Sequence, residues 1–154
     1  MLNNQNIFNQ KRILVYGLGK SGLSTFKFLK KKNEIYLFDD EKVSDSDKKL
    51  KKSLISHQEL LKKNIDHIII SPGIDINRCS LRNYLKKNYK KINTDLDIFY
   101  NCYNRNKKIT ITGTNGKSTT ARIVYEVLRD QNLDARIVGN IGNPILLEKN
   151  ITNK

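Results

Sequence analysis

The sequence has 154 residues, and 29 lysines and arginines against 15 aspartates and glutamates give a net charge of +14 at neutral pH. This length allows one ordinary domain, or one small domain with part of a second, and a hydrophobic content of 38% argues against a fully disordered chain. No apolar run approaches the roughly 18–20 residues that span a bilayer, and the N-terminus lacks the apolar segment of a secretory signal. We therefore expect a soluble, cytoplasmic protein without membrane insertion.

The excess of positive charge raises the question of a nucleic-acid partner. The lysines are scattered along the chain, and aromatic residues do not interleave with them in a pattern typical of RNA-binding proteins. We interpret the charge as a compositional bias over solvated helix faces, so we expect no nucleic-acid partner, although anionic ligands such as nucleotides would be favoured. Cys79, Cys102, His57 and His67 lack the spacing of a metal site.

The first 93 residues alternate short apolar runs with segments of helical periodicity. The runs expected as strands are 12–16, 34–38, 66–71 and 91–93, and the expected helices are 21–32 and 77–88, with shorter ones within 41–53 and 57–63. This alternation is typical of an α/β fold with a parallel sheet that carries helices on both faces. We assign residues 1–93 to a Rossmann-like domain.

Residues 94–154 repeat the strand–glycine–helix unit with different chemistry. The expected elements are a helix at 94–103, a polar joint at 104–108, a strand at 109–112, a helix at 116–130, a strand at 133–138 and the opening of a helix at 144–149. We interpret this segment as the incomplete start of a P-loop-type α/β ATPase domain. Because its strands would form an open half-sheet, we expect it to be loosely packed.

A first glycine-rich turn, G-x-G-x-x-G at residues 17–22, lies between a predicted strand and a predicted helix. In such a turn Gly17 permits the tight bend, Gly19 lets a pyrophosphate approach the backbone, and Gly22 packs the helix on the sheet. Asp39 ends the second strand about 20 residues on, where a dinucleotide fold has its ribose-binding acid. NAD binding and a turn needed only for packing both remain open on this evidence.

A second turn, G-x-x-G-K-S at residues 113–118, follows an apolar run and precedes a helix. It is a shortened P-loop, because the full pattern requires a glycine where this chain has Ile111. Backbone N–H groups would cradle phosphates, Lys117 would add a point charge, and the Ser118 hydroxyl would reach Mg²⁺. Two different anion sites in one chain predict an enzyme that uses ATP in a reaction of a nucleotide-linked substrate.

Five segments carry a family resemblance, in this order: GLGKSGLS at 17–24, SPGI at 71–74, DLDIF at 95–99, ITGTNGKSTT at 111–120 and GNIG at 139–142. Over residues 12–147 they resemble the N-terminal third of the Mur ligases. The turn at 111–120 is similar throughout that family and the related folylpolyglutamate synthases. The first two segments together resemble the branch that adds D-glutamate.

The resemblance implies roles for particular residues. UDP-sugar binding would fall to Gly17, Gly19, Lys20, Ser21, Gly22, Asp39, Asp40, Ser71, Gly73 and Asn140. ATP binding would fall to Gly113, Thr114, Asn115, Gly116, Lys117, Ser118 and Thr119, with Lys117 catalytic and Ser118 at Mg²⁺. Lys20 and Ser21 would face the diphosphate, and the carboxylates of Asp39 and Asp40 would lie at the uridine.

The resemblance also implies an activity in peptidoglycan synthesis. ATP would convert the carboxylate of UDP-N-acetylmuramoyl-L-alanine to an acyl phosphate, which the amine of D-glutamate then attacks, in a monomeric enzyme. Members of the family are much longer, with a metal-binding acid, a modified lysine and an amino-acid-binding domain further along, so we expect this polypeptide alone not to ligate. The alternatives are a UDP-sugar-binding module without catalysis and an NAD-binding domain.

Overall fold

The computed structural model describes residues 6–41, 48–139, 141–148 and 151. Within them four parallel strands form a sheet: β1 (Arg12–Tyr16), β2 (Glu34–Phe38), β3 (His67–Ile70) and β4 (Ile92–Asn93), in the order β2-β1-β3-β4. The parallel α/β architecture expected from the sequence is confirmed. From β1 the chain moves first to β2 on one side and then back to β3 on the other, so the direction of winding reverses between β1 and β3.

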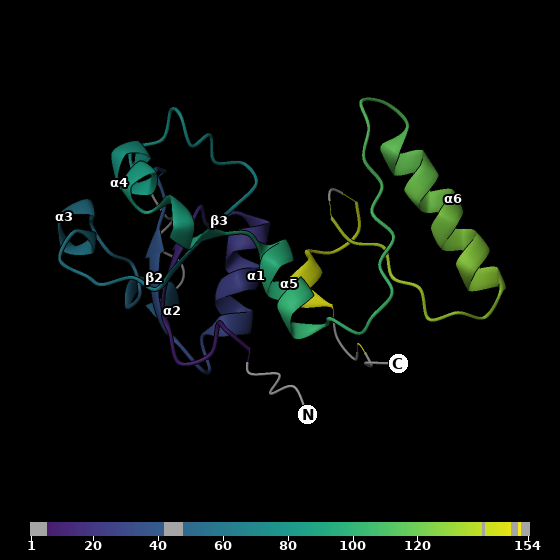
Figure 1. Ribbon diagram of the computed structural model, residues 1–154, viewed down its shortest axis with the longest axis horizontal. Helices are drawn as coiled ribbons and strands as arrows, with labels where there is room; N and C mark the ends of the chain where they lie inside the picture. Colours follow the sequence, from purple (N-terminus) through teal and green to yellow (C-terminus); the bar gives the residue numbers. More distant parts are fainter. Residues whose placement is uncertain (1–5, 42–47, 140, 149–150, 152–154) are drawn as a thin grey trace.

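Helices cover both faces of the sheet (Figure 1). They are α1 (Lys20–Leu29), α2 (Lys48–Lys51), α3 (His57–Leu60), α4 (Arg82–Lys87), α5 (Asp95–Cys102) and α6 (Lys117–Asp130), with 3₁₀ turns η1 (Tyr89–Lys91) and η2 (Ile145–Leu147). The expected helices at 57–63 and 77–88 are thus shorter, since 61–63 and 77–81 adopt turns. Among the described helices, none is long and apolar enough to cross a membrane.

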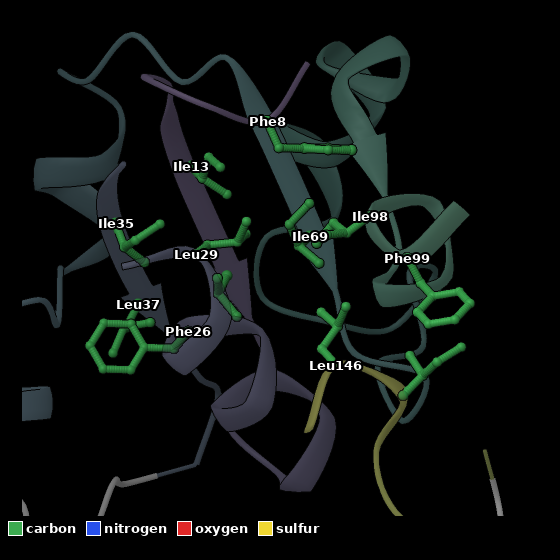
Figure 2. Packing of buried hydrophobic residues seen from close by; sticks show 12 residues of the cluster. Phe8, Ile13, Phe26, Leu29, Ile35, Leu37, Ile69, Ile98, Phe99 and Leu146 are labelled. Carbon is green, nitrogen blue, oxygen red and sulfur yellow. The ribbon is translucent and has the colours of Figure 1, made fainter. Parts of the chain in front are cut away.

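Alternate residues of each buried strand supply two hydrophobic clusters, as the side-chain period of a strand requires. On one face Ile13 and Val15 of β1 pack with residues of α1, α5 and η2 (Figure 2). On the other face Leu14 and Tyr16 pack with residues of α3 and α4. Because β1 is buried on both faces, its sequence is a continuous apolar run.

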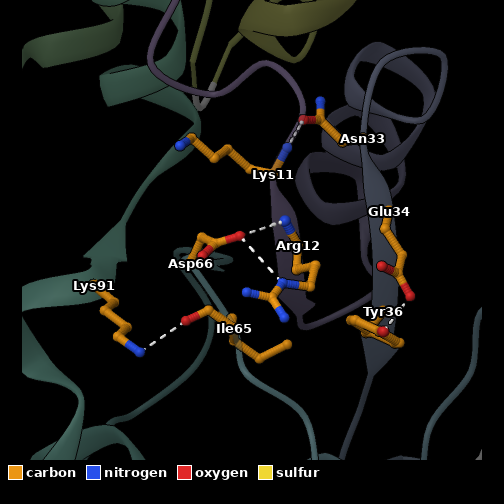
Figure 3. A network of polar contacts seen from close by, with 8 residues as sticks. All are labelled: Lys11, Arg12, Asn33, Glu34, Tyr36, Ile65, Asp66 and Lys91. Carbon is orange, nitrogen blue, oxygen red and sulfur yellow. Dashed lines mark hydrogen bonds and ion pairs between the residues drawn. The ribbon is translucent and has the colours of Figure 1, made fainter.

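The amino ends of the strands are held by polar contacts (Figure 3). Asp66, which precedes β3, accepts a hydrogen bond at 2.8 Å from the backbone N–H of Arg12 and a longer one, at 3.5 Å, from its Nε. The backbone bond is the main reason why the pKa of the Asp66 carboxyl lies below its usual value. The N–H of Lys11 donates to Oδ1 of Asn33 at 2.9 Å. These contacts fix where β1 and its neighbours begin.

The strands predicted at 109–112 and 133–138 are wrong, because the described residues there form no strand. A parallel strand needs a neighbour to pair its backbone N–H and C=O groups, and the one pairing in this part of the described chain is an isolated bridge between Val138 and Asn143. Ile109 is 64% exposed. α6 forms as predicted but buries none of its residues, and it stands apart from the sheet in Figure 1.

The chain returns to the first core after α6. Ile145 and Leu146 of η2 are 7% and 5% exposed and pack with α1 and α5. Two elements from the predicted second segment, α5 and η2, therefore complete the core built on the sheet. The domain boundary between residues 93 and 94 stays a prediction.

Candidate functional site

The carboxyl ends of β1 and β3 meet at the point where the winding reverses, which is where ligands bind in open α/β sheets. Gly17 follows β1 and Ser71 follows β3. The Ser71 hydroxyl donates to the carbonyl oxygen of Gly17 at 2.7 Å, and its N–H donates to the carbonyl oxygen of Tyr16 at 2.9 Å. Gly73, two residues on, is exposed. The structure thus brings the first glycine turn and the SPG segment together.

The three glycines of the first turn have different surroundings. Gly17 has φ +89°, and a Cβ there would lie 2.8 Å from the Cβ of Ser71. A Cβ on Gly22 would lie 1.8 Å from the carbonyl oxygen of Gly17. A Cβ on Gly19, in contrast, would meet nothing within 4 Å. Packing therefore requires Gly17 and Gly22, whereas Gly19 borders open space at the start of α1.

The N-terminus of α1 is prepared for an anion. Gly19 is its N-cap and provides no side-chain cap, and the first turn contains no acidic residue. Helix N-termini carry unpaired N–H groups and a partial positive charge, which together favour phosphate. Lys20 is exposed beside them. The hydroxyl of Ser21, which is predicted to face the diphosphate, donates to Oδ2 of Asp95 in α5 at 2.6 Å.

The two aspartates after β2 hold other loops of the same edge. The carboxylate of Asp39 accepts hydrogen bonds from the N–H of Leu18, inside the glycine turn, and from the N–H of Glu41 at 2.9 Å. The carboxylate of Asp40 accepts from the Tyr16 hydroxyl at 2.6 Å and from the side chain of Ser80. Both aspartates follow the carboxyl end of β2 and are engaged with protein groups.

Tyr16, Asp40 and Ser80 form a polar clip that joins the connections after β1, β2 and β3. Burial opposes ionisation of Asp40, but hydrogen bonds from Ser80 and Tyr16 outweigh it and lower the pKa of its carboxyl. Burial, helped by the bond to Asp40, raises the pKa of the Tyr16 phenol. The sequence did not predict that Tyr16 and Ser80 would contact Asp40. In the sequence, Tyr16 is only the last residue of an apolar run that predicts a strand.

Replacing Tyr16 with phenylalanine is expected to lower the free energy of unfolding by about 1 kcal/mol at pH 7. It removes one donor to Asp40 and keeps the edge-on contact of the ring with Phe38. The pKa of Asp40 should rise. The pKa of Asp40 is lower in the folded than in the unfolded chain. The carboxylate therefore stabilises the folded state above the unfolded pKa of about 4, and this stabilisation is lost as the pH falls. Urea unfolding between pH 3 and 7 and a carboxyl NMR titration measure both effects.

Tyr36→Phe is the matched control for this prediction. It removes a phenol that donates to the carboxylate of Glu34, at the opposite end of β2 from Asp40. This variant should leave the pKa of Asp40 unchanged. If the pKa of Asp40 changed equally in both variants, or in neither, the hydrogen bond from Tyr16 would not be a cause of the lowered pKa.

The second turn has the backbone of a phosphate-binding loop. Gly113 and Gly116 have φ +145° and +73°, and Gly116 is the N-cap of α6. The ammonium of Lys117 donates to the carbonyl oxygen of Gly113 and, at 3.0 Å, to that of Thr114. Asn115, Ser118 and Thr119 are exposed. Among the described residues, no side chain caps the N-terminus of α6, and the Lys117 ammonium lies against the backbone of the loop.

A dedicated protein metal site is not seen in the part of the chain that the structure describes, where no group of three or more His, Cys, Asp or Glu side chains could hold an ion. The Ser118 hydroxyl is a hard oxygen ligand of the kind Mg²⁺ accepts, and Mg²⁺ is often held by few protein groups together with substrate phosphates. The donor set therefore fits Mg²⁺ bound jointly with a nucleotide. Asn140, predicted at the UDP-sugar, lies outside the described residues.

Comparison with known proteins gives two family matches. The model described as "Mur ligase MurD-like, N-terminal domain" matches residues 11–93, and "Mur ligase middle domain" matches residues 111–154. Curated relatives named UDP-N-acetylmuramoylalanine–D-glutamate ligase include those of Rickettsia bellii (33% identical over 147 residues, 93% of this chain) and Caldicellulosiruptor bescii (34% over 145 residues, 88% of this chain).

These alignments cover 32% of each of the two relatives, so the chain spans about a third of the length of the curated relatives it matches. A relative from Rickettsia prowazekii is 32% identical over 150 residues, which make up 33% of its length. Since the first family match alone covers more than half of the chain, the chain belongs to the Mur ligase family, with an N-terminal domain of the MurD-like type.

Proposed function

We propose that this chain supplies the UDP-sugar site and part of the ATP site of a ligase of peptidoglycan synthesis that joins D-glutamate to UDP-N-acetylmuramoyl-L-alanine. The observation that carries the proposal is the presence of two different anion-binding turns in one Mur ligase chain, each at the start of a helix. The names of the curated relatives support the choice of substrates. We expect this ligase to act as a monomer in the cytoplasm.

The UDP-sugar would bind between the turn after β1 and the segment after β3. The N–H groups at the start of α1, with Lys20 and Ser21, would hold the diphosphate, while Asp39 and Asp40 would border the uridine. Ser71 and Gly73 would lie near the sugar, and Asn140 would reach it from the GNIG loop. The open space beside Gly19 supports this orientation, because a phosphate needs close approach to the backbone there.

ATP would bind at the second turn, in contact with the residues from Gly113 to Thr119. ATP supplies the phosphoryl group that activates the substrate carboxylate as an acyl phosphate. Lys117 is the proposed catalytic residue, since its ammonium can exchange the loop carbonyl oxygens for phosphate oxygens and stabilise their charge. Ser118 would hold Mg²⁺ together with those phosphates.

A UDP-sugar-binding module without catalysis is the second candidate, for the 154-residue polypeptide on its own. The observation that favours it is that residues 109–112 and 133–138, which flank α6, form no strand, and that an isolated bridge between Val138 and Asn143 is the one β pairing described there. We expect the purified chain to bind the UDP-sugar without ligating. ADP release that depends on D-glutamate would overturn this expectation.

A thermal-shift titration with UDP-N-acetylmuramoyl-L-alanine, run beside NADH, tests the proposed substrate. Ligand at about one hundred times its dissociation constant should add roughly 2.7 kcal/mol to the free energy of unfolding, which is a rise of several degrees for a domain of this size. A shift with the UDP-sugar alone would support the ligase proposal. A shift with NADH alone would mean that the first turn is a dinucleotide site and that the proposal is wrong.

A further inference from the structure

The first turns of α1 and α5 are joined by the hydrogen bond from the Ser21 hydroxyl to Asp95. We propose that Asp95 is a placeholder anion, whose carboxylate competes with the diphosphate of a nucleotide for Ser21 and for the N-terminus of α1. In this role Asp95 lowers the affinity of the site for its ligand. The inference rests on the proposed function, because it requires a diphosphate at the first glycine turn.

The competition follows from the hydrogen-bonding capacity of a serine. A hydroxyl has a single O–H to donate, and Ser21 donates it to Asp95 at 2.6 Å, a length within the range of O–H···O⁻ bonds. While that bond exists, Ser21 cannot donate to a phosphate oxygen. A diphosphate must therefore displace the carboxylate before it gains this donor.

Asp95 lies where the N-termini of two helices come together. Asp95 is the first residue of α5 and Ser21 the second of α1, so the positive ends of two helix dipoles meet at their bond. The two helices lie side by side on one face of the sheet (Figure 1). α1 has no acidic residue in its own first turn, and Asp95 supplies that charge from another element.

Asp97, in the same turn of α5, has a different role. Its carboxylate accepts hydrogen bonds from the N–H of Thr94 at 2.7 Å and from the Thr94 hydroxyl at 2.8 Å, which closes a capping box. The cap of α5 is thus complete without Asp95. The contact between Asp95 and Ser21 is therefore additional to what the helix needs to begin.

The proposal predicts a gain of affinity on removal of the charge. Asp95→Asn and Asp95→Ala should bind UDP about three- to tenfold more tightly than the parent chain, because a like charge near the diphosphate is lost. Affinity for uridine, which carries no phosphate, should not change. A contact that only fastens α5 to α1 would have the opposite effect, since its loss would loosen the site.

Isothermal titration of UDP and uridine at fixed ionic strength tests the proposal, with Asp97→Asn as the matched control that removes the same charge from the same turn. The control should bind UDP within twofold of the parent chain. Unchanged or weaker UDP binding by both Asp95 variants, or equal tightening in the control, would overturn the inference and leave the proposed function standing. If the parent chain and all variants bind neither UDP nor the UDP-sugar, the proposed function fails and the inference with it.

Discussion

Replacing Gly22 with alanine is expected to destabilise the protein by about 3 kcal/mol or more. The new Cβ would lie 1.8 Å from the carbonyl oxygen of Gly17 and 2.9 Å from the hydroxyl oxygen of Ser71. The first of these atoms belongs to the backbone of the glycine turn, so relief requires α1 to move away from the sheet. Thermal unfolding should show a fall in Tm of roughly 10–20 °C for a domain of this size.

Gly19→Ala is the matched control, because it adds the same methyl group three residues away. Gly19 has φ −66°, which alanine adopts freely, and its Cβ would meet nothing within 4 Å. The free energy of unfolding of Gly19→Ala should stay within about 0.5 kcal/mol of that of the parent chain. UDP affinity should nevertheless fall about tenfold, because the methyl group would stand where a phosphate approaches the backbone.

The two substitutions separate the two explanations of the glycine turn. If the turn exists only for packing, Gly19→Ala should change neither stability nor UDP binding. If it also binds a diphosphate, Gly19→Ala should lose binding without losing stability. A Gly22→Ala chain that unfolds at the parent temperature would contradict the packing described for α1.

Much of this site could be predicted from the sequence because its signals are local. The G-x-G-x-x-G spacing predicted a tight bend at Gly17 and helix packing at Gly22, and the apolar runs predicted β1, β2 and β3. The topology of a parallel sheet then brings Ser71 to Gly17, although 54 residues separate them. The helix predicted at 94–103 likewise forms, as α5 (Asp95–Cys102).

The contacts that the sequence did not reveal depend on partners distant along the chain. The bond of Asp95 to Ser21 joins residues 74 positions apart, and no spacing rule connects them. The apolar run at 109–112 has the composition of a strand, yet a strand also needs a neighbour, which composition does not disclose. The return of η2 to the first core had no signal beyond the three apolar residues that follow Pro144.

Replacing Leu146 with alanine is expected to lower the free energy of unfolding by about 2–4 kcal/mol. Leu146 is 5% exposed and belongs to the cluster that α1 and α5 form with the sheet. Truncation would leave a cavity between elements that are more than 100 residues apart in sequence. Urea unfolding followed by far-UV circular dichroism measures the loss.

Leu147→Ala is the control, since it makes the same change one position on, where the side chain is 40% exposed. It should stay within about 0.5 kcal/mol of the parent chain. A large loss for Leu146 alone would mean that the segment after α6 stabilises the domain that carries the UDP-sugar site, which would be incomplete if cut at residue 93. Equal, small losses at both positions would mean that residues up to 103 hold this core without η2.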